Sequence, residues 1–189
     1  MSDSQFEREV LQRLLFDLLL VTDGRTTDIL ETLLNEKVRV EVIRQEQIAN
    51  EDINLLGESS GGPYYIRESI LVGEKSGLVV SHNIALVYSK HVPKALYESL
   101  THRQEGIGKA INSLGVRTFR KVLDSGFMNR TDTIDLFQRP VTINFANSDQ
   151  QLPYKRYYIY FGRSPGIQML EYYHPNLISH RLEQELKKE

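Results

Sequence analysis

The fold is decided by residues 64–88, which read YYIRESILVGEKSGLVVSHNIALVY. Two largely apolar runs, at 64–72 and 78–88, flank the short polar segment 73–77, which begins and ends with glycine. Runs rich in β-branched and aromatic residues predict strands, and a glycine-bounded polar segment of this length predicts a hairpin turn between them. The sequence therefore predicts two adjacent antiparallel strands here.

Further strands are predicted on both sides of this hairpin. Valines alternate with charged residues in the first of these segments, a pattern typical of a strand with one solvated face. The turn residues 163–166 predict a second hairpin, and the glycine- and serine-rich segment 50–63 predicts a loop. The predicted strand segments are 38–42, 131–137, 141–145, 154–162 and 167–173.

Helices are predicted where apolar residues recur every three or four positions. The leucine stripe between Val10 and Leu19 is expected to pack in the core. Hairpin-linked strands and helices that occur in blocks predict an α+β fold with a mainly antiparallel sheet, in a single domain of residues 1–189. The predicted helices are 2–21, 26–35, 94–100, one that follows Gly108 and includes Phe119, Val122 and Leu123, and 177–189.

Composition narrows the classes of function. The chain has 189 residues, of which 40% are hydrophobic and 25% charged, as in an ordinary folded domain. Its 23 basic and 25 acidic residues give a net charge of -2, so we expect no nucleic-acid partner and no membrane partner. The absence of cysteine excludes disulfides and thiolate nucleophiles. Without a signal peptide or a membrane-length apolar run, we expect a soluble, cytoplasmic protein.

Standard catalytic motifs are missing from the sequence. It contains no phosphate-binding loop, no dinucleotide glycine fingerprint, no His-Glu-x-x-His zinc motif and no Gly-x-Ser-x-Gly nucleophile elbow. No pair among its 5 histidines has the spacing of metal ligands on a helix. We therefore expect neither a metal site nor a cofactor.

Charged residues inside predicted strands are the main candidates for a functional site. Arg67 shares a strand face with Ser69, whereas Glu68 points to the opposite face. Glu171 lies in the strand Gln168-Met169-Leu170-Glu171-Tyr172-Tyr173. Such charges usually belong to a solvated face or a structural ion pair. If Arg67 and Glu171 face one cavity, the arginine suits a carboxylate ligand and the glutamate suits proton transfer.

The segment Glu105-Gly106-Ile107-Gly108-Lys109 is a further candidate. Glycines at the start of a helix leave backbone N–H groups open to an anion, although the same pattern often marks only a turn.

Together these segments, in their order and spacing, resemble the chorismate lyase family, especially its short single-domain branch. The likeness covers most of residues 10–175. The similar segments are Asp23-Gly24-Arg25-Thr26, residues 38–45, Ile66-Arg67-Glu68-Ser69-Ile70-Leu71, residues 81–93, Gly106-Ile107-Gly108 and Met169-Leu170-Glu171-Tyr172-Tyr173.

The resemblance implies a six-stranded antiparallel sheet with helices that close over an internal ligand pocket. Arg67 would hold the ring carboxylate of chorismate, supported by the backbone at Arg25 and at Ile107 and Gly108. Glu171 would face the ring oxygen from which the enolpyruvyl group departs. The reaction gives 4-hydroxybenzoate and pyruvate without metal or cofactor, and quinone biosynthesis is the common use of that product.

Two other functions remain open from the sequence. The same fold serves as a non-catalytic ligand sensor in some transcription regulators, and a lyase acting on another cyclic acid is a third possibility. Arg25 stands where the family often has a smaller or apolar residue, so its side chain binds the second carboxylate of chorismate, marks a different anionic ligand, or points to solvent. The combination of Arg67 with Glu171 favours the enzyme, and we expect a monomer with a small-molecule substrate.

Overall fold

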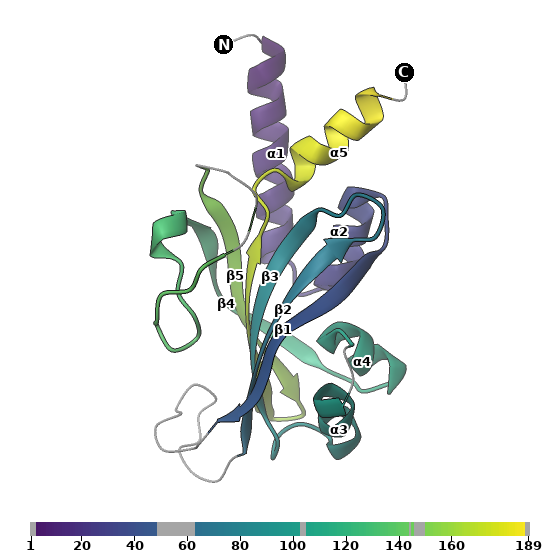
Figure 1. Cartoon of the computed structure of the whole chain (residues 1–189), viewed down its shortest axis with the longest axis vertical. Helices are drawn as coiled ribbons and strands as arrows, with labels where there is room; N and C mark the ends of the chain where they lie inside the picture. The colour runs from purple at the N-terminus through teal and green to yellow at the C-terminus, as the bar shows by residue number, and fades with distance from the viewer. Residues whose placement is uncertain (1–2, 49–62, 103–104, 144, 146–149, 188–189) are drawn as a thin grey trace.

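The computed structural model describes residues 3–48, 63–102, 105–143, 145 and 150–187. Six strands form one antiparallel sheet in the order β1-β2-β3-β6-β5-β4 (Figure 1). The predicted α+β class with a six-stranded antiparallel sheet is therefore confirmed. The strands are β1 (Val38–Ile48), β2 (Tyr64–Gly73), β3 (Val79–Tyr88), β4 (Phe119–Met128), β5 (Leu152–Phe161) and β6 (Ser164–Tyr173).

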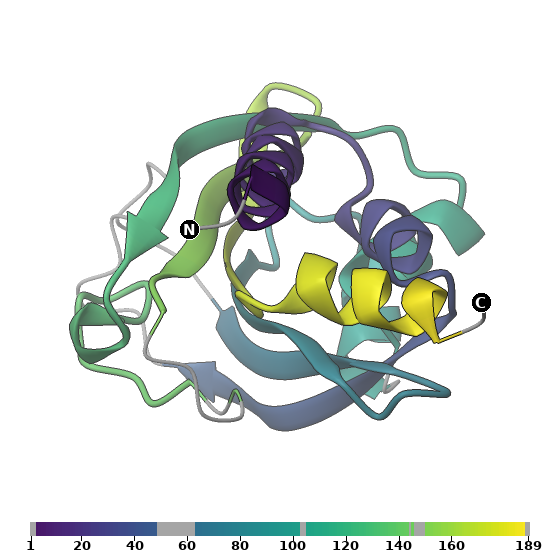
Figure 2. The same cartoon turned by 90° about the horizontal axis from the view of Figure 1, so that it is seen from above.

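Helices cover one face of this sheet from two ends. Figures 1 and 2 show α1, α2 and α5 gathered at one end and α3 and α4 at the other. Among the described residues, no helix combines the length and the apolar character that a membrane crossing requires. The helices are α1 (Asp3–Val21), α2 (Thr26–Leu34), α3 (Lys94–His102), α4 (Ile107–Ser113) and α5 (Leu177–Leu186), with a 3-10 turn η1 (Arg130–Asp132).

Strand register decides which side chains share a face. Arg67 on β2 pairs with Ala85 on β3, which pairs with Met169 on β6, which pairs with Tyr157 on β5. Since side chains alternate along a strand, this row and the neighbouring row that contains Glu171 project to the same side of the sheet. Charges that are distant in sequence are thereby brought to one face.

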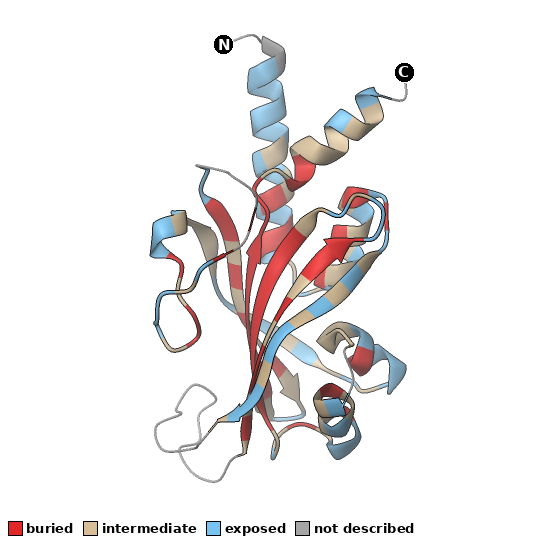
Figure 3. Ribbon diagram, in the orientation of Figure 1, coloured by how far each residue is buried: buried red, intermediate tan, exposed pale blue. Residues whose placement is uncertain are grey.

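The apolar core is divided, and the division leaves room for a site. On the helix-covered face, one cluster packs α3 and α4 against the sheet around Leu96 and Ile111, and another packs α1, α2 and α5 around Leu19 and Leu30. The opposite face carries a third cluster, covered by residues between β4 and β5 such as Ile143. Figure 3 shows that buried residues follow the central strands.

The prediction that a helix continues through residues 119–123 is wrong. α4 ends at Ser113, Gly115 takes a left-handed φ of 62°, and Phe119, Val122 and Leu123 lie on β4. Short apolar runs fit a helix or a strand equally well by periodicity alone, and pairing with β5 decides the outcome here.

Two predicted strands and one predicted turn are also corrected. Residues 131–137 and 141–143 lie outside the named strands, and among them only Ile134 forms a bridge, an isolated one to Pro140. The β5–β6 turn is tighter than predicted, because Phe161 pairs with Ser164 and Gly162 adopts a φ of 85°. Most of the predicted loop 50–63 lies outside the described residues.

The expectation that the whole leucine stripe of α1 packs in the core is wrong. Leu14 and Leu18 are 55% and 64% exposed, whereas Phe16, Leu19 and Leu20 are buried. Figure 1 shows why: α1 projects beyond the sheet, so only its C-terminal part reaches the core.

Candidate functional site

A cavity of about 730 Å³ lies on the helix-covered face of the sheet. Arg67 and Ser69 of β2, Asn83 of β3 and Glu171 of β6 line it, as do the beginnings of α2 and α4. Arg67 and Glu171, the two charged residues singled out in the sequence, therefore line the same cavity. A cavity of this size suits a small molecule, and most of the residues that line it are polar or charged, as a polar ligand requires.

Arg67 is buried at one side of this cavity. Its guanidinium donates to the carbonyl oxygen of Leu100 at 3.2 Å and to that of Glu105. Burial lowers the pKa of Arg67, and the negative charge of Glu105 acts in the opposite direction. These two bonds hold the guanidinium in place while its other N–H donors keep the geometry that matches a carboxylate.

Glu171 accepts hydrogen bonds from hydroxyl groups on three elements. Tyr157 donates to Oε1 at 3.1 Å, and Tyr173 and Thr26 donate to Oε2 at 2.6 Å and 3.3 Å. Burial raises the pKa of Tyr157 and of Tyr173 well above the usual value, and the charge of Glu171 adds to that rise. Both phenols therefore stay protonated and act as donors that stabilise a carboxylate.

Lys155 of β5 pairs with Glu171 in the strand register and supports this arrangement without lining the cavity itself. Its ammonium donates to the carbonyl oxygens of Leu19 and Thr22 at 3.1 Å and 3.3 Å, and to the hydroxyl of Thr26 at 3.5 Å. Burial lowers the pKa of Lys155, while the charge of Glu171 opposes that change. Lys155 thus links the end of α1 to Thr26, which itself contacts Glu171.

The structure answers the question about the Arg25 side chain. Arg25 is the N-cap residue of α2 at the cavity, but its side chain is 57% exposed and its guanidinium pairs with Asp28 at 2.6 Å. The side chain is thus held in a local ion pair, and the backbone of Arg25 is the part that begins α2 at the cavity.

The glycine segment before α4 also borders the cavity. Gly106 is the N-cap residue, and a Cβ there would lie 3.0 Å from a methyl group of Val40 on β1. A larger residue at this close approach would require the Val40 side chain to shift. Ile107 and Gly108 begin the helix and line the cavity, and a Cβ on Gly108 would meet only open space.

Two cavity residues were not anticipated from the sequence. Asn83 pairs with both Ser69 and Glu171 across the sheet, and its Oδ1 is buried without a partner in the described part of the chain. Arg120 of β4 lines the same cavity. The prediction of a helix through residues 119–123 hid the role of Arg120, because the apolar residues of this segment fit a helix and a strand equally well until β5 pairs with them.

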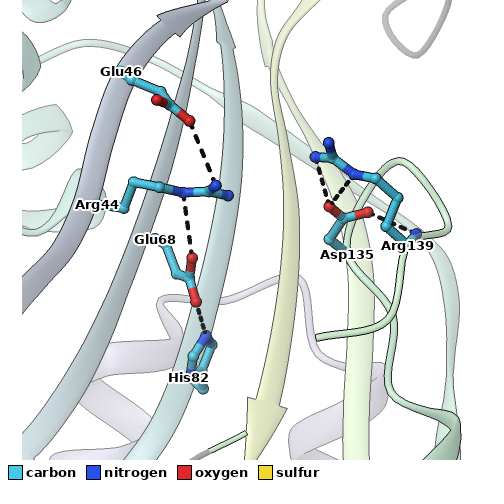
Figure 4. A network of polar contacts seen from close by, with 6 residues as sticks. All are labelled: Arg44, Glu46, Glu68, His82, Asp135 and Arg139. Carbon is cyan, nitrogen blue, oxygen red and sulfur yellow. Dashed lines mark hydrogen bonds and ion pairs between the residues drawn. The ribbon is translucent and has the colours of Figure 1, made fainter. Parts of the chain in front are cut away.

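Glu68 lies on the other face of the sheet, as strand alternation predicts. It contacts His82 at 2.8 Å and Arg44 at 3.5 Å, and Arg44 also pairs with Glu46 (Figure 4). Glu68 is thus a member of a structural ion-pair network. Figure 4 also shows a separate ion pair, that of Asp135 and Arg139.

The fold and the cavity define a small-molecule-binding domain whose pocket suits a carboxylate. The model of the Rv2949c-like chorismate pyruvate-lyase family matches residues 20–177, and the chain belongs to this family. The family resemblance inferred from the sequence is confirmed.

Individual relatives are distant. A chorismate pyruvate-lyase of Mycobacterium leprae is 27% identical over 124 residues, which is 64% of this chain and 59% of that protein, so the chain spans well under two thirds of this relative. The effector domain of PhnF from Mycobacterium smegmatis superposes with a TM-score of 0.56 at 15% identity, over 82% of this chain and 91% of that one. A GntR-family transcriptional regulator from Bacillus cereus gives 0.51 at 15% identity, over 74% and 92%. These structures share the fold.

Proposed function

We propose that this protein is a chorismate lyase that converts chorismate to 4-hydroxybenzoate and pyruvate without an added metal or cofactor. The observation that carries the proposal is that Arg67 and Glu171 line one cavity. Membership of the chorismate pyruvate-lyase family supports the choice of substrate. We keep quinone biosynthesis as the proposed use of the product, and the monomeric state stays a prediction.

The chemistry requires orientation and the transfer of one proton. Chorismate carries a carboxylate on its ring, a hydroxyl para to it, and an enolpyruvyl ether on the neighbouring ring carbon. The hydroxyl-bearing carbon loses its proton, the bond between the ring and the ether oxygen breaks, and the departing enolpyruvate gains a proton to become pyruvate. The ring becomes aromatic and keeps its hydroxyl, so the reaction is driven by aromatisation and depends mainly on substrate positioning.

Each end of the substrate has a suitable partner in the cavity. Arg67 binds the ring carboxylate through its guanidinium fork, supported by backbone groups at Arg25, Ile107 and Gly108. Glu171 faces the ring edge that carries the hydroxyl and the ether. Because Tyr157 and Tyr173 donate to it, Glu171 acts as the carboxylate that takes the proton from the ring and returns it to the leaving group.

The decisive experiment mixes purified protein with chorismate in the absence of added metal or cofactor. We expect 4-hydroxybenzoate and pyruvate in equal amounts, and their formation should be abolished in Glu171→Gln. The same variant should still bind 4-hydroxybenzoate, since the Arg67 end of the cavity is unchanged.

The alternatives give different results in this experiment. If 4-hydroxybenzoate binds but chorismate stays intact, the protein is a ligand-binding module of the kind that shares its fold. If another cyclic carboxylic acid is cleaved instead, Glu171 keeps its role and the substrate assignment is wrong. Turnover that survives in Glu171→Gln would refute the proposed role of this carboxylate.

A further inference from the structure

We propose that Arg120 binds the second carboxylate of the substrate, the one on the enolpyruvyl group, and so selects a dicarboxylate over a monocarboxylate. This inference rests on the proposed function, because it names the part of chorismate that Arg67 and Glu171 leave without a partner. It assigns a specificity-determining role to a residue on the edge strand β4.

Arg120 lies on the side of the cavity opposite to Arg67. In the strand order, Arg67 on β2 is separated by β3 from Glu171 on β6, and β5 separates Glu171 from Arg120 on β4. Figure 2 shows the sheet curving around the helices, so strands that are far apart in this order bound one space. All three residues accordingly line the same cavity.

The guanidinium of Arg120 has no acceptor among the described residues. Its side chain is half-buried, its Nε is buried without a hydrogen bond, and it forms no ion pair with another residue in the described part of the chain. Among the other cations that line the cavity, Arg25 pairs with Asp28 and Lys37 pairs with Glu31, whereas the side chain of Lys109 is exposed to solvent. A buried N–H donor without an acceptor, such as the Nε of Arg120, is costly, and an anionic ligand would remove that cost.

Electrostatics place this charge near the reacting end of the cavity. Burial and the carboxylate of Glu171 raise the pKa of Tyr157, and the positive charge of Arg120 acts in the opposite direction. Arg120 also acts on Lys155, after burial and Glu171. The charge of Arg120 therefore acts on the same groups that surround Glu171.

The chemistry of the substrate fits this spacing. The enolpyruvyl group is attached next to the hydroxyl-bearing carbon that Glu171 faces, so its carboxylate extends past Glu171 and away from Arg67. An arginine at that point binds the leaving group in the substrate but finds no partner in 4-hydroxybenzoate. Once pyruvate departs, this half of the interaction is lost, and product binding relies on Arg67.

Two stable ligands test the inference without any need for turnover. We would measure the affinity of 3-(carboxymethoxy)-4-hydroxybenzoate, which mimics both carboxylates, and of 3-methoxy-4-hydroxybenzoate, which lacks the second one. The wild-type chain should prefer the dicarboxylate roughly 10-fold or more, as expected for a charge-assisted hydrogen bond. Arg120→Gln should abolish the preference and leave the affinity for the methoxy ligand within about 2-fold.

The matched control is Lys121→Gln, which removes the same charge from the adjacent, exposed position of β4. It should retain the wild-type preference. If Arg120→Gln fails to fold, Arg120→Lys, which keeps the charge but loses the planar fork, should show an intermediate preference. The ratio of the two ligand affinities in the wild-type chain tests the inference even without a variant. Equal affinities of the wild-type chain for the two ligands would overturn it.

The outcomes separate this inference from the proposed function. A wild-type preference that Arg120→Gln removes, together with intact chorismate, supports the Arg120 subsite and refutes the lyase. Cleavage of chorismate, together with an equal loss of affinity for both ligands in Arg120→Gln, supports the lyase and refutes the subsite.

Discussion

Replacement of Arg67 by alanine tests whether Arg67 binds the ligand directly through its charge or only holds the neighbouring chain in place. The variant loses a desolvated, charge-assisted contact to the ring carboxylate, which is worth roughly 1.5–3 kcal/mol. The Kd for 4-hydroxybenzoate should therefore rise roughly 10- to 150-fold. It also loses its two hydrogen bonds to the carbonyl oxygens of Leu100 and Glu105, so the free energy of unfolding should fall by about 1–3 kcal/mol.

Gln45 provides the control for this second effect. It pairs with Arg67 in the β1–β2 register, and its Nε2 donates to the carbonyl oxygens of Leu100 and Thr101 at 2.9 Å and 3.2 Å, but it does not line the cavity. Gln45→Ala should thus lower stability by a similar amount and leave the Kd near its wild-type value. Calorimetric titration and urea unfolding measure the two quantities. Equal losses of affinity in both variants would refute a direct contact between Arg67 and the ligand.

Two further predictions concern buried groups beside and behind the site. Lys155→Met should lower the free energy of unfolding by about 1–3 kcal/mol, since the carbonyl oxygens of Leu19 and Thr22 lose their donor. It should also lower kcat, because the hydroxyl of Thr26 loses the contact with Lys155 that supports it. Urea unfolding and steady-state kinetics measure the two effects, and a variant unchanged in both would contradict the prediction. Burial lowers the pKa of His82 from 6.5, against the opposing charge of Glu68, so His82 is neutral in the folded chain. Below pH 6.5 the unfolded chain then binds more protons than the folded chain does. The contribution of His82 to stability should therefore be fully present above that pH and decline below it, by at most about 1.4 kcal/mol per pH unit. Unfolding free energies measured between pH 5 and 8 give this slope, which His82→Gln should reduce.

The central hairpin and the two cavity charges were predictable because they depend on local alternation. A period of two places Arg67 and Glu68 on opposite faces whatever the strand pairs with, and the flanking apolar residues show which segments are strands. The structure follows this pattern, with Arg67 in the cavity and Glu68 in an ion-pair network on the other side.

Lys155 and Arg120 were not predictable, because their environments arise from distant parts of the chain. Lys155 stands beside Arg156 in a strand and has the pattern of a solvated face, yet the end of α1 covers it through a contact to Leu19, 136 residues earlier. Arg120 depends on an edge strand whose apolar residues fit a helix equally well until β5 pairs with them. Periodicity predicts which face a residue occupies, but not what covers that face.

The placement of Glu171 favours catalysis over sensing by a physical argument. A module that only binds an anion gains affinity from Arg67 and loses affinity from a buried carboxylate, because two neighbouring negative charges that are partly shielded from water repel each other. Yet Glu171 lines the same cavity and accepts hydrogen bonds from the hydroxyls of Tyr157 and Tyr173. Such an arrangement weakens ground-state binding, and it is useful only if the carboxylate interacts more favourably with the transition state than with the bound ligand. A proton leaving the ring carbon supplies that interaction. The affinity of Glu171→Gln for 4-hydroxybenzoate should therefore equal or exceed that of the wild-type chain while turnover is lost, and a variant that binds the product more weakly would instead indicate that Glu171 serves recognition.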